Sequence, residues 1–359
     1  LKFCQKYNIK NVFLNSEYPF NENQRNIKLE KLCIENAIDY KEFDSQLINP
    51  NQIKNNSGQP FKVFTPFSKK MRLLMSSEIL EEIPEPLKQE KVVLNQDEVP
   101  DFEHIFARDL NFPIENIPVT EESCDQRLEA FIDSSIGQYK ELRDIPSITA
   151  TSNLSSSFAI GLISSKQAIN KVLSRLPDDA GTGQFSWITE IIWREFYKYI
   201  TYHFPHVSKG KSFNPKYDHI SWRDDEASFL KWCEGKTGIP IIDAAMRQLN
   251  ETKWMHNRLR MITAMFLSKN LLVDWRKGER YFMENLIDGD FCSNNGGWQW
   301  SASTGVDASP YFRIFNPITQ SEKFDPDGKF IKKFVPELID CPTNEIHNPS
   351  IETRSSLNY

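Results

Sequence analysis

Residues 254–300 contain an unusual concentration of aromatic, charged and amide side chains. The stretch begins with Trp254-Met-His-Asn257-Arg-Leu-Arg260-Met261, continues through Asp274-Trp275 and Asp288-Gly-Asp290, and ends with Asn294-Asn-Gly-Gly-Trp298-Gln-Trp300. Indole, guanidinium, amide and carboxylate groups alternate here with leucines and methionines, and a buried polar group left unpaired costs roughly 1–3 kcal/mol. We therefore expect these side chains to line a cavity. All eight tryptophans lie between Trp187 and Trp300, which places the cavity in this part of the chain.

The composition describes a globular chain. Its 359 residues suffice for about two domains with cores of their own. Because no apolar run approaches the roughly 20 residues of a membrane span and no signal peptide is evident, we expect a cytoplasmic protein. The six cysteines form no CxxC pair, which predicts reduced thiols and no metal site. A net charge of −6 argues against a nucleic-acid partner but leaves a local basic face open.

Hydrophobic periodicity predicts an α/β front followed by an all-α remainder. Residues 1–45 alternate helix, strand, helix and strand, with strands at 12–14 and 38–43, as in the incomplete remnant of a parallel α/β domain. Residues 46–120, interrupted by Asn, Pro and Gly, predict an interdomain linker ordered in part by Phe61, Phe64 and Phe67. Residues 121–359 predict a large all-α domain. We expect its helices at 121–136, 155–162, 165–174, 184–203, 224–235, 239–251, 256–269, 274–285 and 297–302.

Hydroxyl groups cluster where one of these helices begins. Thr151-Ser-Asn-Leu-Ser155-Ser-Ser157 places them beside unpaired backbone N–H groups, which together with the helix dipole bind phosphate. The alternative is simple N-capping by Ser155, which these residues alone favour.

Two helices carry polar groups on an aromatic face. Trp187, Glu190, Arg194 and Tyr197 share one face, and Trp254, Asn257 and Met261 share another. Salt bridges and core methionines would explain both faces, but Glu190 lies among isoleucines and needs an arginine or a ligand donor. Asn and Glu hydrogen-bond to base edges, and Trp stacks on bases. We expect only a structural role for His256, since no catalytic triad surrounds it.

A short acidic turn is a further candidate binding site. Asp288-Gly-Asp290 offers too few ligands for a dedicated Ca²⁺ site. Its carboxylates are better suited to accept hydrogen bonds from a heterocycle or a ribose.

Taken in order, these segments resemble the photolyase/cryptochrome family of flavoproteins, and most of all its bacterial class I photolyases for cyclobutane pyrimidine dimers. The resemblance covers essentially the whole chain, and the family's chains extend further at both ends, which implies a truncated Rossmann-like antenna domain at the front. The motifs that carry it are Trp193-Arg-Glu-Phe-Tyr197, Glu234-Gly-Lys-Thr-Gly-Ile-Pro240, Asp243-Ala-Ala-Met-Arg247, Trp254 to Met261, Asp274-Trp275-Arg276, Leu286 to Asp290, and Asn294 through Pro317.

The resemblance implies a U-folded FAD in the helical domain, an interpretation that displaces N-capping for the hydroxyl run. Arg260 would pair with Asp288, and Asn294 would face flavin N5. The implied FAD-binding residues are Tyr139, Thr151, Ser152, Asn153, Leu154, Ser155, Trp187, Arg260, Asp288, Gly289, Asp290 and Asn294.

The implied activity is that of a deoxyribodipyrimidine photo-lyase. Reduced FAD (FADH⁻), excited by light, donates an electron to a flipped-out pyrimidine dimer in DNA, the cyclobutane ring opens, and the electron returns. Glu190 and Asn257 would hydrogen-bond to the dimer, Trp193 and Trp300 would flank it, and Met261 would pack against it. The implied DNA-binding residues are Arg143, Arg194, Tyr197 and Arg258.

Further residues match the family's accessory sites. Trp298, Trp275 and Trp222 correspond to its electron-transfer chain, for which core packing is the alternative. Asn21, Glu22 and Lys209 match an antenna site that holds a folate, 5,10-methenyltetrahydrofolate, in some members. We expect a monomer that acts in the bacterial cytoplasm at nucleoid DNA and binds no membrane.

Three alternatives are less consistent with these residues. A cryptochrome photoreceptor, signalling through protein partners, does not require Glu190, Asn257, Met261 and Trp300, all of the repair type. A (6–4) photolyase would carry paired histidines after Trp254. A light-independent flavin oxidoreductase would carry a hydride-acceptor motif such as a glycine-rich dinucleotide fingerprint.

Overall fold

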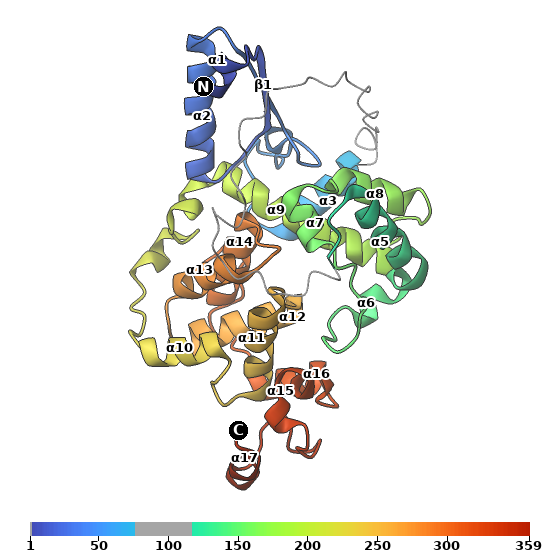
Figure 1. The fold of residues 1–359 in the computed structure, drawn as a ribbon, viewed down its shortest axis with the longest axis vertical. Helices are drawn as coiled ribbons and strands as arrows, with labels where there is room; N and C mark the ends of the chain where they lie inside the picture. Colours follow the sequence, from blue (N-terminus) through green and yellow to red (C-terminus); the bar gives the residue numbers. More distant parts are fainter. Residues whose placement is uncertain (1, 76–116) are drawn as a thin grey trace.

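A two-stranded parallel sheet and its helices form the N-terminal part of the protein, at the top of Figure 1. The computed structural model describes residues 2–75 and 117–359. It begins with α1 (Lys2–Lys6), β1 (Asn11–Asn15), α2 (Phe20–Glu35) and β2 (Asp39–Phe43). The strands pair in parallel with Asn11 opposite Asp39, and α2 makes the crossover that parallel strands require. The predicted alternation of helices and strands is confirmed.

Residues 47–75 pack on the helical part of the protein, although their sequence resembles a linker. They contain a 3₁₀ turn (Pro50–Gln52) and α3 (Phe64–Met75), which contacts α9 (Gly183–His203). Phe64 and Phe67 are buried in the same core as α9, and Phe61 packs against it. The Tyr199 hydroxyl of α9 donates to the carbonyl of Ile53 at 2.8 Å. The rest of the predicted linker, residues 76–116, lies outside the described residues.

Helices make up the rest of the described chain, as predicted. None of the described helices is both long and apolar enough to cross a membrane. Helix α14 begins at residue 291 rather than 297, because the Asp290 side chain accepts from the backbone N–H of Ser293 and caps it. The further helices are α5 (Glu121–Ser134), α6 (Tyr139–Leu142), α7 (Ser155–Ile160), α8 (Ser165–Leu173), α10 (Glu226–Glu234), α11 (Pro240–Thr252), α12 (Asn257–Met265), α13 (Trp275–Asn285), α14 (Phe291–Ala302), α15 (Pro317–Phe324), α16 (Lys329–Phe334) and α17 (Ile351–Leu357).

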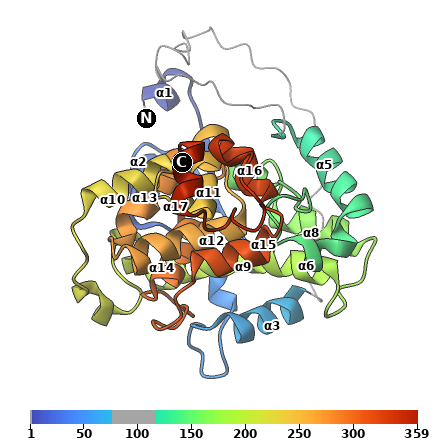
Figure 2. The same cartoon turned by 90° about the horizontal axis from the view of Figure 1, so that it is seen from below.

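The helical part contains two apolar cores. One core joins α3, α5, α8 and α9, and the other joins α10 to α16. Figure 1 shows α5 to α8 on the right and α10 to α14 to the left and below, with α9 between the two groups, and Figure 2 shows α5, α6 and α8 again apart from α10, α12, α13 and α14. The two groups of helices meet where α9 packs on α14. Each group of helices buries its apolar residues in its own core, so the surfaces that face each other between the groups can enclose a cavity.

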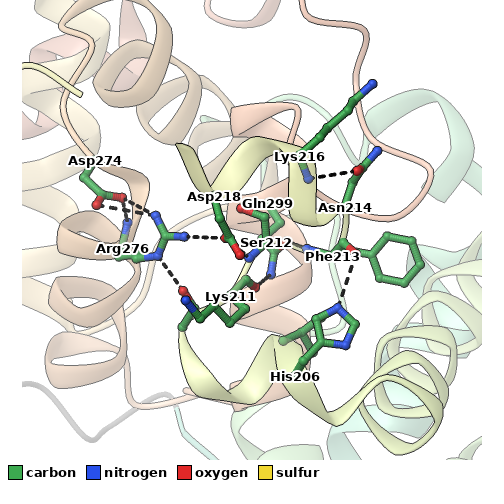
Figure 3. Close-up of polar contacts among 12 residues, drawn as sticks. His206, Lys211, Ser212, Phe213, Asn214, Lys216, Asp218, Asp274, Arg276 and Gln299 are labelled. Carbon is green, nitrogen blue, oxygen red and sulfur yellow. Dashed lines mark hydrogen bonds and ion pairs between the residues drawn. The ribbon is translucent and has the colours of Figure 1, made fainter. Parts of the chain in front are cut away.

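The segment that connects α9 to α10 is held against α13 and α14 by a cluster of hydrogen bonds (Figure 3). The guanidinium of Arg276 on α13 donates to the carbonyl of Gly210 at 2.6 Å and pairs with Asp218 at 3.3 Å. The side chain of Gln299 on α14 accepts from the backbone N–H of Phe213 at 2.7 Å. The cluster thereby ties down the connection that carries Trp222.

The contact between α9 and α14 depends on a glycine. A Cβ at Gly296 would lie 2.0 Å from Cδ1 of Tyr197, whereas a Cβ at the neighbouring Gly297 meets nothing within 4 Å. We expect Gly296→Ala to lower the free energy of unfolding by about 1–3 kcal/mol through overpacking. The control Gly297→Ala should instead raise it by roughly 0.5–1 kcal/mol, the usual gain of alanine in a helix. Urea unfolding of both variants measures the difference, and equal stabilities would contradict this packing.

Candidate active site between the two helix groups

A cavity of about 490 Å³ lies between the two groups of helices. Helices α6, α7, α9, α12 and α14 contribute its walls, together with the acidic turn at 288–290. The structure thus brings together most of the side chains singled out from the sequence. The predicted residues that line it are Tyr139, Arg143, Ser152, Ser155, Trp187, Glu190, Trp193, Arg194, Tyr197, Asn257, Arg258, Arg260, Met261, Asp288, Asp290 and Trp300.

Other predicted residues lie elsewhere. Asn294 and Trp298 line a second cavity of about 140 Å³ that shares Asn257, Arg260 and both aspartates with the first. Neither of these two cavities is lined by Thr151, Asn153, Leu154, Gly289, Trp275, Trp222, Asn21, Glu22 or Lys209. Leu154 is buried in the core beside α9 instead.

Some lining residues were not predicted. Asp144 and Phe158 face the larger cavity, and Ser293 and Gly297 line both cavities. Asp144 directly follows Arg143, and this adjacency was the available signal for it. Phe158 and the α14 residues follow from helix packing, which the sequence pattern does not specify.

Every charged side chain that lines the larger cavity belongs to an arginine–carboxylate pair. The pairs are Arg143 with Glu190, Arg194 with Asp290 at 3.3 Å, Arg258 with Asp144 at 2.7 Å, and Arg260 with Asp288 at 2.8 Å. The predicted pairing of Arg260 with Asp288 is therefore present. Asp288 has only 2% of its side chain exposed, and the contact with Arg260 compensates its burial.

The surroundings move the pKa values of two carboxyl groups in opposite directions. Burial raises the pKa of Glu190, although the guanidinium of Arg143 opposes the shift. Burial also acts to raise the pKa of Asp290, but the charges of Arg194 and Lys198 and the hydrogen bonds from Ser293 outweigh it, so this pKa is lowered. Asp290 therefore remains an ionised acceptor, whereas Glu190 takes up a proton more readily than an exposed glutamate.

The hydroxyl run does not cap its helix. The N-cap position of α7 is Leu154, and no side chain accepts a hydrogen bond there, so the interpretation of Ser155 as an ordinary N-cap is wrong. Instead, the indole N–H of Trp187 donates to Ser152 Oγ and that of Trp254 donates to Ser155 Oγ, both at 3.3 Å. Both serines line the cavity, where their hydroxyl groups remain able to donate.

An unpredicted aromatic stack supports one wall. The ring of Phe64 on α3 stacks on the indole of Trp193, with centroids 3.5 Å apart and planes 5° apart. Asp307 accepts from the backbone N–H of Phe64 at 2.9 Å and so fixes the start of α3. The segment that resembles a linker therefore positions a side chain of the site.

The three tryptophans of the predicted electron-transfer chain differ in burial. Trp298 and Trp275 are buried, and their indole N–H groups find no acceptor among the described residues. Trp222 is partly exposed and packs against the same core. Trp298 lines the smaller cavity, whereas Trp222 is in contact with solvent.

The walls fit a flavin dinucleotide. The volume lies in the range of ligand sites, and aromatic rings alternate with a few polar groups. Serine hydroxyl groups and arginines suit a diphosphate, and the carboxylates of Asp288 and Asp290 suit the N–H and O–H groups of a heterocycle and sugar.

His256 has the structural role that the sequence predicts. Its Nδ1 accepts from the backbone N–H of Arg258 at 3.2 Å, which caps α12. The ring is buried, and this burial lowers its pKa to about 4. The imidazole is therefore neutral in the folded protein at pH 5.

Stability should consequently fall as the pH drops from 7 to 5. The unfolded chain takes up a proton at an ordinary histidine pKa near 6.5 while folded His256 does not, so this residue accounts for a loss of about 2 kcal/mol. His256→Asn keeps an acceptor at the N-cap but does not titrate, so its loss should be smaller by that amount. Urea unfolding at both pH values tests this, and parallel losses would contradict it.

Comparisons with known proteins agree with this site. The family model described as the FAD binding domain of DNA photolyase matches residues 187–358, and the model described as DNA photolyase matches residues 1–88. The chain is 43% identical over 354 residues to the deoxyribodipyrimidine photo-lyase of Escherichia coli (strain K12), an alignment that covers 96% of this chain and 73% of that protein.

Solved structures show the same relationship. A class III photolyase from Agrobacterium tumefaciens superposes with a TM-score of 0.85 at 36% identity, over 99% of this chain and 75% of that one. A cryptochrome from Synechocystis sp. PCC6803 superposes with a TM-score of 0.83 at 26% identity, over 99% and 76%. On the identity and coverage of these relatives, the chain belongs to the DNA photolyase family.

Proposed function

We propose that this protein is a deoxyribodipyrimidine photo-lyase that repairs cyclobutane pyrimidine dimers in DNA by light-driven electron transfer. The observation that carries this proposal is one cavity in which Glu190, Asn257 and Trp300 lie together with Asp288 and Asp290. When bound in its reduced form, FAD supplies one electron to the lesion on illumination and recovers it after the ring opens. The protein binds, orients and shields the reacting partners.

The cofactor side of the cavity is formed by the acidic turn and the hydroxyl run. Asp288, held by Arg260, and Asp290, held by Arg194, accept hydrogen bonds from the ring system and the sugar. Ser152 and Ser155 bind the diphosphate, and Tyr139 and Trp187 pack beside it, with Thr151, Asn153, Leu154 and Gly289 shaping the surrounding backbone. Asn294, which lines the adjoining cavity, would face flavin N5.

The lesion side is formed by α9, α12 and α14. Glu190 and Asn257 hydrogen-bond to the dimer, Met261 packs on it, and Trp193 and Trp300 stack against the flipped bases. The raised pKa of Glu190 favours this role, because a carboxyl group that takes up a proton readily can donate to a pyrimidine carbonyl.

Arginines of the cavity wall bind the DNA backbone. Arg143 and Arg258 contact phosphates, assisted by Tyr197. Arg194 donates to the carbonyl of Phe158 at 2.9 Å and pairs with Asp290, so it links the DNA side to the cofactor side. We place the protein, as a monomer, in the bacterial cytoplasm at nucleoid DNA.

A folate antenna at the front of the molecule is a further part of the proposal. The ammonium group of Lys209 lies 3.6 Å from the centre of the ring of Phe20, which directly precedes Asn21 and Glu22 in the sequence. The Ser208 hydroxyl accepts from the backbone N–H of Phe20 at 2.9 Å. These contacts of Phe20 with Ser208 and Lys209 support the assignment.

Signalling as a cryptochrome is the alternative, favoured by the similarity to the Synechocystis structure. Restoration of pyrimidine absorbance in a dimer-containing oligonucleotide, illuminated with the reduced protein, separates the two. Absorbance should recover in the light and remain unchanged in the dark. A protein that retains flavin but leaves the dimer intact under illumination would refute repair.

Loss of the Glu190 side chain should impair repair without releasing the flavin. Since one hydrogen bond is worth about 1 kcal/mol, Glu190→Ala should weaken dimer binding roughly fivefold and lower the repair yield per absorbed photon. Glu190→Gln keeps a hydrogen-bonding side chain and should retain most of that yield. Flavin absorbance and repair per photon are the measurements, and an unchanged yield in the alanine variant would remove Glu190 from this role.

Loss of Trp298 should separate photoreduction from repair. Trp298→Phe should block photoreduction of the oxidised flavin, because phenylalanine is not readily oxidised, yet spare repair by protein reduced beforehand. The matched control is Trp232→Phe: Trp232 is also buried, with its ring centroid 6.0 Å from that of Trp298, but is not in the predicted chain. Flavin absorbance under light with an external reductant follows the reaction. Photoreduction at the rate of the unaltered protein in the Trp298 variant would contradict this pathway.

A further inference from the structure

The carboxylate of Asp144 forms an ion pair with the guanidinium of Arg258, one of the two arginines assigned to DNA phosphates. Arg258 NH2 lies 2.7 Å from Asp144 Oδ2, and Arg258 Nε lies 3.3 Å from Oδ1. The guanidinium also lies over the ring of Phe324, 4.4 Å from its centroid. Arginine forms the same two-pronged contact with a phosphate as with a carboxylate, so Asp144 presents the geometry of a bound phosphate.

This pair is open to exchange. The side chain of Arg258 is 17% exposed and that of Asp144 is 32% exposed, and both line the cavity. Because both side chains reach the cavity, a phosphate that enters it can contact the same guanidinium. A DNA phosphate can therefore displace Asp144, but only after the internal contact is broken.

Among the described residues, Asp144 forms an ion pair with Arg258 and with no other arginine. Arg143, the adjacent residue, pairs with Glu190. The negative charge of Asp144 also contributes to raising the pKa of Glu190, behind the dominant effect of burial. The contact with Arg258 is thus the main attachment of the Asp144 carboxylate.

We propose that Asp144 is an internal competitor of the DNA backbone, which neutralises Arg258 in the free protein and lowers affinity for damaged and undamaged DNA alike. The proposal rests on the proposed function, since it takes Arg258 as a phosphate ligand. Phosphate contacts carry no information about the base, so the ratio of the two affinities stays the same. The effect is weaker retention on the undamaged DNA that makes up most of a genome.

The matched control is the pair of Arg72 with Asp178. Their side chains are 15% and 28% exposed, and Arg72 lies 3.8 Å from the centroid of the Phe185 ring, much as Arg258 lies over Phe324. Neither Arg72 nor Asp178 lines the cavity. Asp178→Asn therefore changes net charge and breaks an ion pair just as Asp144→Asn does, but away from the site.

Binding of the flavin-loaded protein to a labelled duplex, with or without one thymine dimer, is measured in the dark by fluorescence anisotropy. Asp144→Asn should tighten both complexes roughly threefold to tenfold. The slope of log affinity against log salt should become more negative by about 0.9, because one more arginine is free to neutralise a phosphate. Asp178→Asn should change neither quantity, and thermal unfolding verifies that all variants fold.

Double substitution identifies the route of the effect. Arg258→Ala should weaken binding, and Asp144→Asn should give no gain in that background. The competitor role is overturned if Asp144→Asn weakens binding, which would make Asp144 a support for Arg258. It is also overturned if Asp178→Asn tightens binding equally, or if the gain survives without Arg258.

The same variants distinguish failure of the inference from failure of the proposed function. If Arg258→Ala weakens binding but Asp144→Asn does not tighten it, only the competitor role is lost. If Arg258→Ala leaves binding unchanged, the phosphate assignment and the competitor role are both lost. Dimer repair by the unaltered protein is scored separately, so an absence of repair rejects the activity without deciding the role of Asp144.

Discussion

Pairing of arginines with carboxylates is the constraint on which this site depends. A charge removed from water costs several kcal/mol unless a partner compensates it, and the cavity wall carries charges of both signs. Each arginine on the wall meets one carboxylate, and in each pair the partners come from different elements. The pairs therefore hold α9, α12, the residues after α6 and the acidic turn at fixed positions around a hollow.

The hollow exists because the helical part has two cores. Each group of helices buries its own apolar residues, and they approach each other closely where α9 meets α14 at a glycine. Polar groups are tolerated on the facing surfaces because they pair across the gap. A single continuous core would have filled this space with apolar side chains and left no room for a cofactor.

The same pairing links binding to electrostatics. Arg194 and Arg260 fix the aspartates on the proposed cofactor side, whereas Arg143 and Arg258 are paired with Glu190 and Asp144 and are the arginines that DNA phosphates would contact. The site thus contains two kinds of pair. In the first kind the carboxylate would bind the cofactor, and in the second kind the arginine would contact DNA. Asp144 belongs to the second kind, which is why a residue outside the motifs has a place in the proposed function.

Much of this was predictable from sequence because it is local. Helical periodicity follows from i, i+3 and i+4 spacing, so the helices at 121–136, 165–174 and 184–203 were placed close to their observed bounds. The side chains on the aromatic faces of α9 and α12 were singled out because polar groups among apolar neighbours need partners. The start of α14 was predicted six residues too late, at 297 instead of 291. Glycine is unfavourable inside a helix, so Gly296 and Gly297 indicated a helix end there.

Spacing along the chain and residue type were enough to predict most of the helices and to single out most of the side chains that line the cavity, but they did not predict α3, α6 or α15 to α17. The partners of these side chains depend on the folded arrangement: Asp144 pairs with Arg258, Phe64 stacks on Trp193, and the serine hydroxyl groups accept from indoles instead of capping their own helix. Those contacts join segments far apart in the chain. Their geometry is set by how two closed cores face each other, and a local pattern carries no record of that arrangement.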